Sequence, residues 1–198
     1  MLEWENFVVS MARIVFDSVP VSDETPSILK ARLREKLRRE ERVGDSALVR
    51  KALAEWIRQH PQVHTIATYA ALPDEVHLAE LVMTFPEKRW LFPRVDGDQV
   101  RFHASTNPAL DLARGAFGIL EPRADSPDVP IGEIDAFLCP GMAFDQKGGR
   151  LGRGKGFYDR LLSMARSDAH KIGVAFPSQI VPDTYREPHD IVMDEIIF

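Results

Sequence analysis

Residues 140–162 read PGMAFDQKGGRLGRGKGFYDRLL, and the predicted fold is organised around this stretch. It holds six of the chain's twelve glycines, and its five basic residues are Lys147, Arg150, Arg153, Lys155 and Arg160. An apolar run at 136–139 precedes it and an apolar helical pattern at 158–164 closes it, which predicts a strand, a glycine-rich basic loop and a helix. Glycine lets backbone N–H groups converge on an oxyanion, and a helix start adds positive potential. We therefore expect a polyphosphate site here.

Outside this stretch, predicted strands and helices alternate. Apolar periodicity, with start signals such as Thr25-Pro26, predicts helices at 25–42, 46–59, 76–84 and 159–166. Apolar runs predict strands at 63–70, 89–95, 99–104, 134–139, 171–176 and 191–198, and Asp96-Gly97-Asp98 predicts a hairpin between two of them. We expect an α/β fold, with a mostly parallel central sheet flanked by helices and an antiparallel hairpin. It would form a single domain at 25–198, after an N-terminal extension at 1–24.

The composition indicates one globular domain with a mildly acidic surface. The 198 residues are 44% hydrophobic and 28% charged, with a formal net charge of -5, so we expect no nucleic-acid partner. No apolar run approaches the roughly 20 residues of a membrane-spanning helix, and the N-terminus lacks the pattern of a secretory signal. We therefore expect no membrane association and a cytoplasmic location. The one cysteine, Cys139, excludes an intramolecular disulfide and is interpreted as a small buried thiol.

The glycine-rich stretch resembles a Walker A loop but departs from it at one position. The template G-x-x-x-x-G-K-[ST] fits from Gly149 through Lys155, but Gly156 stands where a hydroxyl should bind magnesium. A Mg²⁺ ligand must then come from carboxylates elsewhere, and the candidates are Asp159, Asp145, Asp190 and Asp194. The alternative role for Asp159 is a helix cap. The mutual repulsion of the clustered cations favours a bound anion.

Three further features allow both a structural and a functional interpretation. Lys30, Arg34 and Arg38 recur every four residues, and they form either a solvated basic face or, through the first two, part of the phosphate site. Glu75 lies at a strand-to-helix junction, where a carboxylate either stabilises the helix start or accepts a hydrogen bond from a ligand. Phe117 is either a core residue or a ring that stacks on a ligand.

The sequence contains no pattern for a histidine metal site or a covalent nucleophile. His60 and His64 are four residues apart, but Pro61 between them spoils a shared helical face. No serine lies in a nucleophile elbow. The chemistry on offer is positioning and charge stabilisation.

The run at 140–162 closely resembles the signature of the 5-formyltetrahydrofolate cyclo-ligases, also called methenyltetrahydrofolate synthetases. Weaker similarity extends over 29–198, in segments at 30–34, 69–76, 91–95, 118–122 and 188–190. Residues before about Ser27 have no counterpart. The resemblance implies ATP-dependent cyclisation of 5-formyltetrahydrofolate to 5,10-methenyltetrahydrofolate, through a phosphorylated formyl group, with ADP and phosphate released. It implies Mg²⁺ as cofactor and two small-molecule substrates, ATP and 5-formyltetrahydrofolate, and we expect a monomer.

The resemblance also implies roles for individual residues. Lys30 and Arg34 would contact ATP phosphates, and Asp159 and Asp190 would hold Mg²⁺. The residues that would wrap the nucleotide are Arg150, Leu151, Gly152, Arg153, Gly154, Lys155, Gly156, Phe157 and Tyr158. The residues that would bind the folate are Ala70, Glu75, Phe117 and Tyr158. Arg153, Lys155 and Tyr158 would be catalytic, because the two cations neutralise the transferred phosphoryl group and Tyr158 lies near the reacting centre.

One position departs from the family pattern, which usually has two tyrosines before the aspartate. Phe157 replaces the first tyrosine, so a role that needs its hydroxyl is lost. Two alternatives to the cyclo-ligase remain. One is a relative that binds nucleotide or folate without turnover, and the other is a phosphosugar isomerase or CoA-transferase-like enzyme of similar fold.

Overall fold

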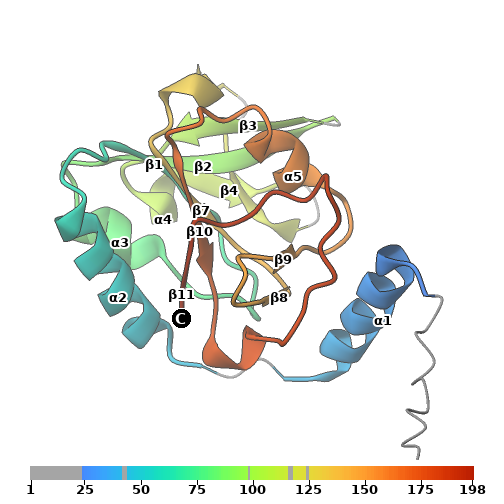
Figure 1. Cartoon of the computed structure of the whole chain (residues 1–198). Coiled ribbons are helices and arrows are strands. Elements are labelled where there is room, and N and C mark those ends of the chain that lie inside the picture. The colour runs from blue at the N-terminus through green and yellow to red at the C-terminus, as the bar shows by residue number, and fades with distance from the viewer. Residues whose placement is uncertain (1–23, 42–43, 98, 116–117, 124) are drawn as a thin grey trace, which may run out of the picture.

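A seven-stranded sheet forms the centre of the computed structural model (Figure 1). The structure describes residues 24–41, 44–97, 99–115, 118–123 and 125–198. Almost all of the predicted extension at 1–24 therefore lies outside the described residues, and so does Phe117. The strand order is β11 (Glu195–Ile197), β10 (His170–Val174), β7 (Ala136–Cys139), β1 (Thr65–Ala67), β2 (Arg89–Asp96), β3 (Gln99–Ala104) and β6 (Asp128–Val129).

The pairing of the strands confirms the predicted sheet. Neighbours from β11 through to β2 pair in parallel, whereas β3 pairs antiparallel with both β2 and β6. The turn predicted at 96–98 joins β2 to β3 as a hairpin, with Asp96 opposite Gln99. The fold is therefore α/β, with a mostly parallel central sheet.

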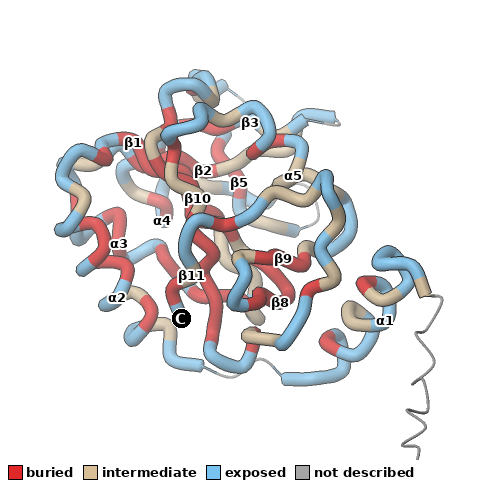
Figure 2. The backbone as a smooth tube through the Cα atoms, in the orientation of Figure 1, coloured by how far each residue is buried: buried red, intermediate tan, exposed pale blue. Residues whose placement is uncertain are grey.

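Helices cover both faces of the sheet because successive strand residues point to opposite sides. On β7, Ala136 and Leu138 belong to the core cluster that contains α2 (Ser46–Gln59) and α3 (Ala79–Thr84). Phe137 and Cys139 belong to the cluster on the other face, with α5 (Phe157–Leu162). In the middle of the sheet, β1 and β7 are buried along their whole length (Figure 2). The central strands are thus continuous apolar runs, as buried parallel strands require.

The first helix, α1 (Pro26–Arg39), lies apart from these two layers (Figure 1). Thr25 caps it, accepting a hydrogen bond from Ile28 N, and Pro26 is its first residue, as the sequence predicts. Its apolar side, Leu33 and Leu37, packs on a short hairpin of β8 (Ala143–Phe144) and β9 (Arg150–Leu151). The rest of its surface is largely exposed (Figure 2). The helix is therefore held through a narrow contact.

The segment between β3 and β7, which has little periodicity, forms several short elements. They are α4 (Pro108–Asp111), β4 (Leu112–Arg114), β5 (Leu120–Pro122) and the 3₁₀ turn η2 (Ile131–Glu133), in addition to β6. A second 3₁₀ turn, η3 (Pro177–Gln179), follows β10. β4 and β5 pair as an antiparallel hairpin, and Arg94 of β2 donates to the Pro122 carbonyl at 2.7 Å. That contact places β5 beside the sheet.

Some predicted boundaries are wrong. The helix predicted at 76–84 begins only at Ala79, because side chains bind the preceding backbone. The Tyr69 hydroxyl donates to the Val76 carbonyl at 3.0 Å, and Ser46 Oγ accepts from His77 N at 3.1 Å. The first helix ends at Arg39 instead of 42, and β1 has three residues where eight were predicted. At the start of α3, tertiary hydrogen bonds that periodicity does not reveal set the boundary.

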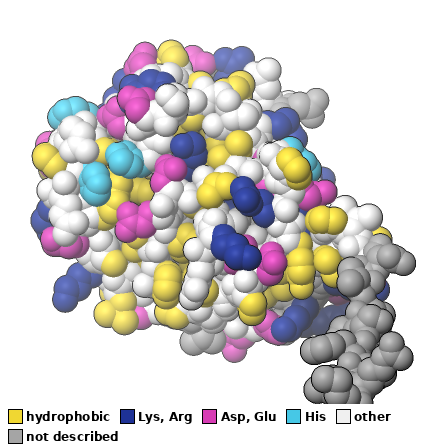
Figure 3. Space-filling model, in the orientation of Figure 1, with side chains coloured by type: hydrophobic (Ala, Val, Ile, Leu, Met, Phe, Trp, Pro, Cys, Tyr) yellow, Lys and Arg dark blue, Asp and Glu magenta, His cyan; other side chains and the backbone are white. Residues whose placement is uncertain are grey.

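The surface carries both signs of charge. On the face shown in Figure 3, basic and acidic side chains are interspersed over the surface. Among the helices that the structure describes, none combines the length and apolarity needed to span a bilayer.

Candidate active site

A cleft of about 650 Å³ opens at the carboxyl ends of the central parallel strands. Ala70, shortly after β1, and Pro140 and Gly141, directly after β7, line it. The chain continues from β1 to β2 on one side and from β7 to β10 on the other, so strand order reverses between β1 and β7. Open α/β sheets bind ligands at such a switch point. The cleft therefore lies where this topology favours a site.

The glycine-rich stretch divides into two parts with different tasks. The first part turns back as the β8–β9 hairpin around Asp145, whose carboxylate accepts from Lys147 N, Gly149 N and both the amide and hydroxyl of Thr184, at 2.6–3.1 Å. A Cβ at Gly149 would lie 2.3 Å from Asp145 Oδ2. Burial opposes the charge on Asp145, but the hydrogen bonds from Thr184 and the loop amides lower its pKa. Asp145 thus stabilises the loop and does not line the cleft, contrary to its candidacy as a metal ligand.

The second part of the stretch, 150–159, lines the cleft. Gly154 and Gly156 have φ of 98° and 65°, which glycine adopts without strain. Gly156 precedes α5, and no side chain caps that helix, so the alternative of Asp159 as a cap is not what the structure shows. Asp159 instead accepts from Arg150 Nη2 at 3.0 Å.

Tyr158 lies next to the Arg150 guanidinium, whose carbon is 5.2 Å from the centre of the Tyr158 ring. Burial, with a further contribution from the neighbouring Cys139 and Glu75, raises the pKa of the Tyr158 phenol well above its usual value. The phenol is therefore protonated at neutral pH and can donate a hydrogen bond. Cys139 is fully buried, and burial raises its pKa to about 12, which confirms its interpretation as an inert thiol.

Helix α1 contributes Lys30 and Arg34 to the cleft. Lys30 is buried and donates to Asp190 and, at 2.8 Å, to Glu187 Oε2. Burial opposes its charge, but these two carboxylates raise the Lys30 pKa, and the Asp190 pKa is lowered by hydrogen bonds from Glu187 N and Lys30 against the effect of burial. Arg34 Nε donates to the Gly152 carbonyl at 2.9 Å. Arg34 thus contacts the glycine-rich stretch and Lys30 the acidic segment at 187–190, while Arg38 is exposed.

Arg153 crosses the cleft from the glycine-rich stretch. Its Nη2 donates to Asp74 Oδ1 at 2.7 Å and to Glu75 Oε1 at 3.2 Å. Glu75 is buried, and its other oxygen accepts from Leu72 N at 3.1 Å. Because α3 starts only at Ala79, stabilisation of a helix start does not explain Glu75.

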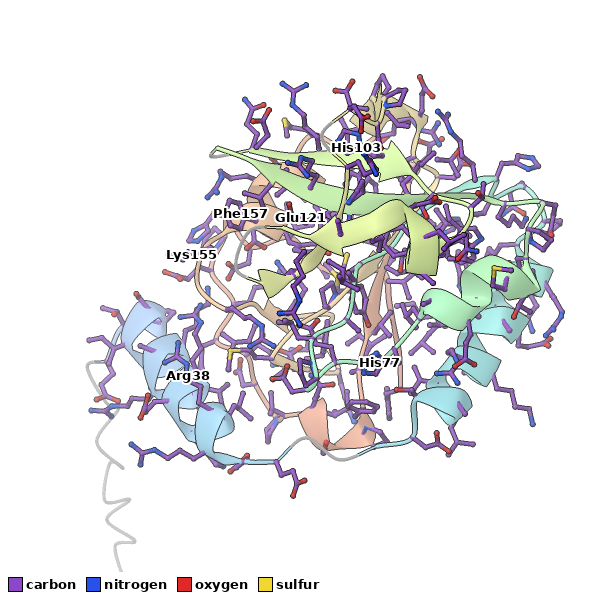
Figure 4. The ribbon with its side chains drawn as sticks, turned by 180° about the vertical axis from the view of Figure 1, so that it is seen from behind. Arg38, His77, His103, Glu121, Lys155 and Phe157 are labelled. Carbon is purple, nitrogen blue, oxygen red and sulfur yellow. The ribbon has the colours of Figure 1, made fainter. Side chains whose placement is uncertain are left out.

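The part of the cleft lined by β2, β3 and the β5 segment, here called its apolar end, has mostly apolar side chains, and the sequence did not predict it. Its lining residues are Pro93, Val95, Val100, Ile119 and Glu121. Glu121 is 3% exposed and sits on β5. In Figure 4, Glu121 lies on the same side of the molecule as Phe157 and Lys155 of the glycine-rich stretch. The only feature of the sequence that points to Glu121 is the segment at 118–122. This segment resembles the family, but the resemblance assigns no role to Glu121.

The structure brings together most of the predicted site residues that it describes, the exceptions being the metal candidates Asp145 and Asp194. Those that line the cleft are Lys30, Arg34, Ala70, Glu75, Arg150, Leu151, Gly152, Arg153, Gly154, Lys155, Gly156, Phe157, Tyr158, Asp159 and Asp190. Phe117 lies outside the described residues. Asp194 does not line the cleft: it accepts from Lys171 N at 2.7 Å. Residues 160 positions apart in the chain, such as Lys30 and Asp190, thus meet in one site.

The acidic side of the cleft has side chains of the kind that coordinate Mg²⁺. One ligand atom each from Glu187, His189 and Asp190 lies within 4.8 Å of the others. Carboxylate oxygens are the ligands that Mg²⁺ prefers, and Glu187 and Asp190 already accommodate one cation, the Lys30 ammonium. Asp159, the other predicted ligand, lines the same cleft but is not part of this cluster, and its carboxylate pairs with Arg150 at 3.0 Å. The cluster of Glu187, His189 and Asp190 therefore fits a divalent cation.

Comparisons with known proteins agree with this site. The sequence model of the 5-formyltetrahydrofolate cyclo-ligase family matches residues 24–198. A 5-formyltetrahydrofolate cyclo-ligase of Mus musculus is 29% identical over 188 residues, covering 86% of this chain and 91% of that protein. One from Mycolicibacterium smegmatis is 40% identical over 87 residues, so the chain spans about half that relative's length, 45%.

Solved structures show the same fold. The NMR structure of 5,10-methenyltetrahydrofolate synthetase from Aquifex aeolicus has a TM-score of 0.71 at 31% identity, and covers 85% of this chain and 89% of its own. A synthetase from Mycoplasma pneumoniae has a TM-score of 0.69 at 24% identity, over 85% and 97% of the two chains. With most of its length matched by the family's sequence model, the chain belongs to the 5-formyltetrahydrofolate cyclo-ligase family.

Proposed function

We propose that this protein converts 5-formyltetrahydrofolate and ATP to 5,10-methenyltetrahydrofolate, ADP and phosphate. The observation that carries the proposal is one cleft with two unlike ends. One end gathers the cationic groups of Lys30, Arg34, Arg150, Arg153 and Lys155, and the other is apolar. A polyanionic nucleotide and a flat heterocycle would fit side by side in such a cleft, with their reactive groups between the two ends.

The reaction needs ATP because a formamide oxygen is a poor leaving group. The formyl oxygen attacks the γ-phosphorus of ATP, an O–P bond forms, the bond to the β-phosphate oxygen breaks, and ADP leaves. N10 of the folate then attacks the formyl carbon, the C–O bond breaks, phosphate leaves and N10 loses its proton. The protein's contribution is alignment and stabilisation of the charge on the transferred group.

Side chains of the glycine-rich stretch are suited to that contribution. Lys155 is exposed in the cleft, and among the described residues its ammonium group has no ion-pair partner, so it is free to meet a phosphoryl group. Arg153 would exchange Asp74 and Glu75 for the transferred phosphoryl group, which would release Glu75 to the folate. Tyr158, with its raised pKa, would donate a hydrogen bond near the reacting atoms.

Mg²⁺ would be held by Asp190 and Asp159, with Glu187 beside the first of them. When bound, it would neutralise part of the phosphate charge. To bind the ion, Asp190 would break its ion pair with Lys30, and Asp159 its ion pair with Arg150. These two cations would then be available to the nucleotide. We further propose that the enzyme is a cytoplasmic monomer whose catalytic unit is the single domain 25–198.

The proposal is tested by incubating the purified full chain with 5-formyltetrahydrofolate, ATP and Mg²⁺. The near-ultraviolet absorbance of the methenyl product should grow, with one ADP released for each product. ATP binding without product would refute the cyclo-ligase activity and identify a non-catalytic relative. Turnover of a sugar phosphate or a CoA thioester in its place would support an isomerase or transferase.

A further inference from the structure

The apolar end of the cleft contains the buried carboxylate of Glu121, which has no role in the proposed reaction as described so far. Glu121 is 3% exposed, yet it is among the residues that line the cleft. Burying a carboxylate is unfavourable unless donors and cations compensate for the lost water. Its surroundings in the cleft are mostly hydrocarbon, from Pro93, Val95, Val100 and Ile119. A carboxylate in this place needs an explanation.

Among the residues that the structure describes, the hydrogen-bond partners of Glu121 are few and distant. Oε1 accepts from Val95 N at 3.4 Å, and Oε2 lies 3.8 Å from Arg94 Nη1. That arginine nitrogen already donates to the Pro122 carbonyl at 2.7 Å, so it supports the hairpin more closely than it supports the carboxylate. An ionised carboxylate can accept about four hydrogen bonds. Glu121 therefore retains unused acceptor capacity beside the cleft.

The local backbone makes room for this carboxylate. Gly115 lies at the end of the β4 strand facing β5, and its amide donates to the Ile119 carbonyl at 2.8 Å. A Cβ at Gly115 would lie 2.3 Å from Glu121 Oε2. Any other residue there would push the glutamate from its position. The lack of a side chain at Gly115 thus leaves room for the Glu121 carboxylate in its present position.

The other acid of the folate side is already well bound. Glu75 has hydrogen bonds from Leu72 N at 3.1 Å and from Arg153 at 3.2 Å, whereas from the described residues Glu121 has none shorter than 3.4 Å. Even after Arg153 leaves it for a phosphoryl group, Glu75 keeps the bond from Leu72 N, so Glu121 has the larger unused acceptor capacity for a donor-rich ligand edge. A ligand's own carboxylate would instead be repelled at this end, because Arg94, partly exposed and otherwise engaged, neutralises Glu121 only weakly.

We propose that Glu121 binds the 2-amino and N3–H groups of the substrate's pyrimidine ring, and so fixes the direction in which the folate enters the cleft. This inference rests on the proposed function. The ring would lie between the side chains of β2 and β3, two neighbouring N–H donors would face one carboxylate, and the N5-formyl group would point toward Lys155 and Arg153. The anionic glutamate tail would lead away from Glu121 toward solvent.

The test is a cycle of two protein forms and two ligands. Wild type and Glu121→Gln are titrated calorimetrically with 5-formyltetrahydrofolate, with its 2-desamino-2-methyl analogue, and separately with ATP. The amide keeps the shape of the side chain but loses the charge and one acceptor. We expect Glu121→Gln to weaken 5-formyltetrahydrofolate binding about tenfold or more, since it removes charge-assisted hydrogen bonds. ATP affinity and the melting temperature should stay close to wild type.

The analogue distinguishes ligand binding from a structural role. Wild type should prefer the substrate over the analogue, and Glu121→Gln should lose most of that preference. Equal preference in both proteins, or unchanged substrate affinity in Glu121→Gln, would overturn the proposal. A variant that weakens ATP and folate alike would mean that Glu121 merely supports the hairpin.

Two controls complete the design. Glu133→Gln, at an exposed glutamate paired with Arg89 outside the cleft, should leave all affinities unchanged. Arg94→Met should keep the preference for the substrate over the analogue, because the carboxylate remains. If wild type binds no folate at all, the proposed function itself fails; if wild type binds and cyclises folate but Glu121→Gln behaves like it, only this inference fails.

Discussion

Lys155 differs from the other cations of the cleft at the level of a single residue. Lys30, Arg150 and Arg153 are each engaged by carboxylates in this structure, and Arg34 donates to the Gly152 carbonyl. Lys155 is exposed, and its ammonium group has no such engagement among the described residues. Because the Lys155 ammonium has no ion pair to break within the described part of the chain, it can bind an arriving phosphoryl group without losing such an interaction. The residue is thus suited to electrostatic stabilisation of the transferred group.

Lys155→Ala should lower kcat about a hundredfold or more, the scale of one lost charge-stabilising donor in an active site. The side chain contacts little, so the melting temperature should not change. Turnover of the methenyl product and thermal unfolding check this, with Lys51→Ala, an exposed lysine of α2, as control. Activity near the wild-type rate would show that Lys155 is not catalytic.

Asp145 illustrates the opposite case, a charged residue with a structural task. Asp145→Asn should destabilise the protein by about 2 kcal/mol, because two amides of the loop and Thr184 lose a charged acceptor. The folded pKa of Asp145 is lowered, so its contribution is complete above the unfolded value of about 3.9 and is lost as the pH falls through the folded pKa. Urea unfolding of both proteins at about pH 7 and about pH 3 should show the difference shrinking with acid. A difference that stays constant with pH would refute the role of the charge.

At the scale of elements, α1 is a separate helix that carries part of the site. Leu33 and Leu37 hold it against β8 and β9, and Lys30 and Arg34 bring it to the cleft. The sequence predicted this helix and the face with Lys30 and Arg34. It could not predict the β8–β9 hairpin on which the helix rests, because strands of two residues have no detectable periodicity and Asp145 stabilises them through Thr184, 39 positions away. The sequence alone therefore predicts a single anion-binding loop where the structure has the β8–β9 hairpin followed by a loop.

Leu37→Ala should loosen α1 and weaken ATP binding. Leu37 is 5% exposed, and its truncation should cost about 2 kcal/mol, at the low end for a buried leucine because the cluster is small. Hydrogen exchange of the α1 amides should accelerate, and the Kd for ATP should rise several-fold. Leu48→Ala is the control, since Leu48 on α2 is 68% exposed and should change stability by less than about 0.5 kcal/mol. Faster exchange with unchanged ATP affinity would place the nucleotide away from α1.

At the scale of the whole molecule, the sheet was predictable and the assembly of the site was only partly so. Buried strands such as 136–139 are apolar on both faces, and such a continuous apolar run can be recognised in one sequence without an alignment. The cations of the glycine-rich stretch were visible because they cluster. Glu121 and Glu187 were missed because each is an isolated acid in an irregular segment, and only the folded chain places them in the cleft. The metal and folate roles of individual residues came from family resemblance and stay predictions.

Removal of residues 1–23 should leave catalysis and stability unchanged. The family match begins at residue 24, and the first helix has its cap at Thr25. A variant that starts at Glu24 should retain kcat/KM for 5-formyltetrahydrofolate within about twofold and the wild-type melting temperature, because every residue found to line the cleft lies after Glu24. Turnover and calorimetry measure both. A large loss of either would give the extension a part in the site.

The ion pairs that Lys30 makes with Glu187 and Asp190 have a consequence for the order in which parts of the protein fold during synthesis. While the ribosome is still synthesising the chain, the sheet from β1 to β7 and its apolar pocket can form before residue 187 exists. During that interval Lys30 has neither of its acidic partners, and α1 is held by its hydrophobic contact and by the hydrogen bond from Arg34 to the Gly152 carbonyl. A nascent chain should therefore acquire its folate end first and its nucleotide end last, and a ribosome-bound fragment that stops before residue 187 should lack a complete nucleotide site.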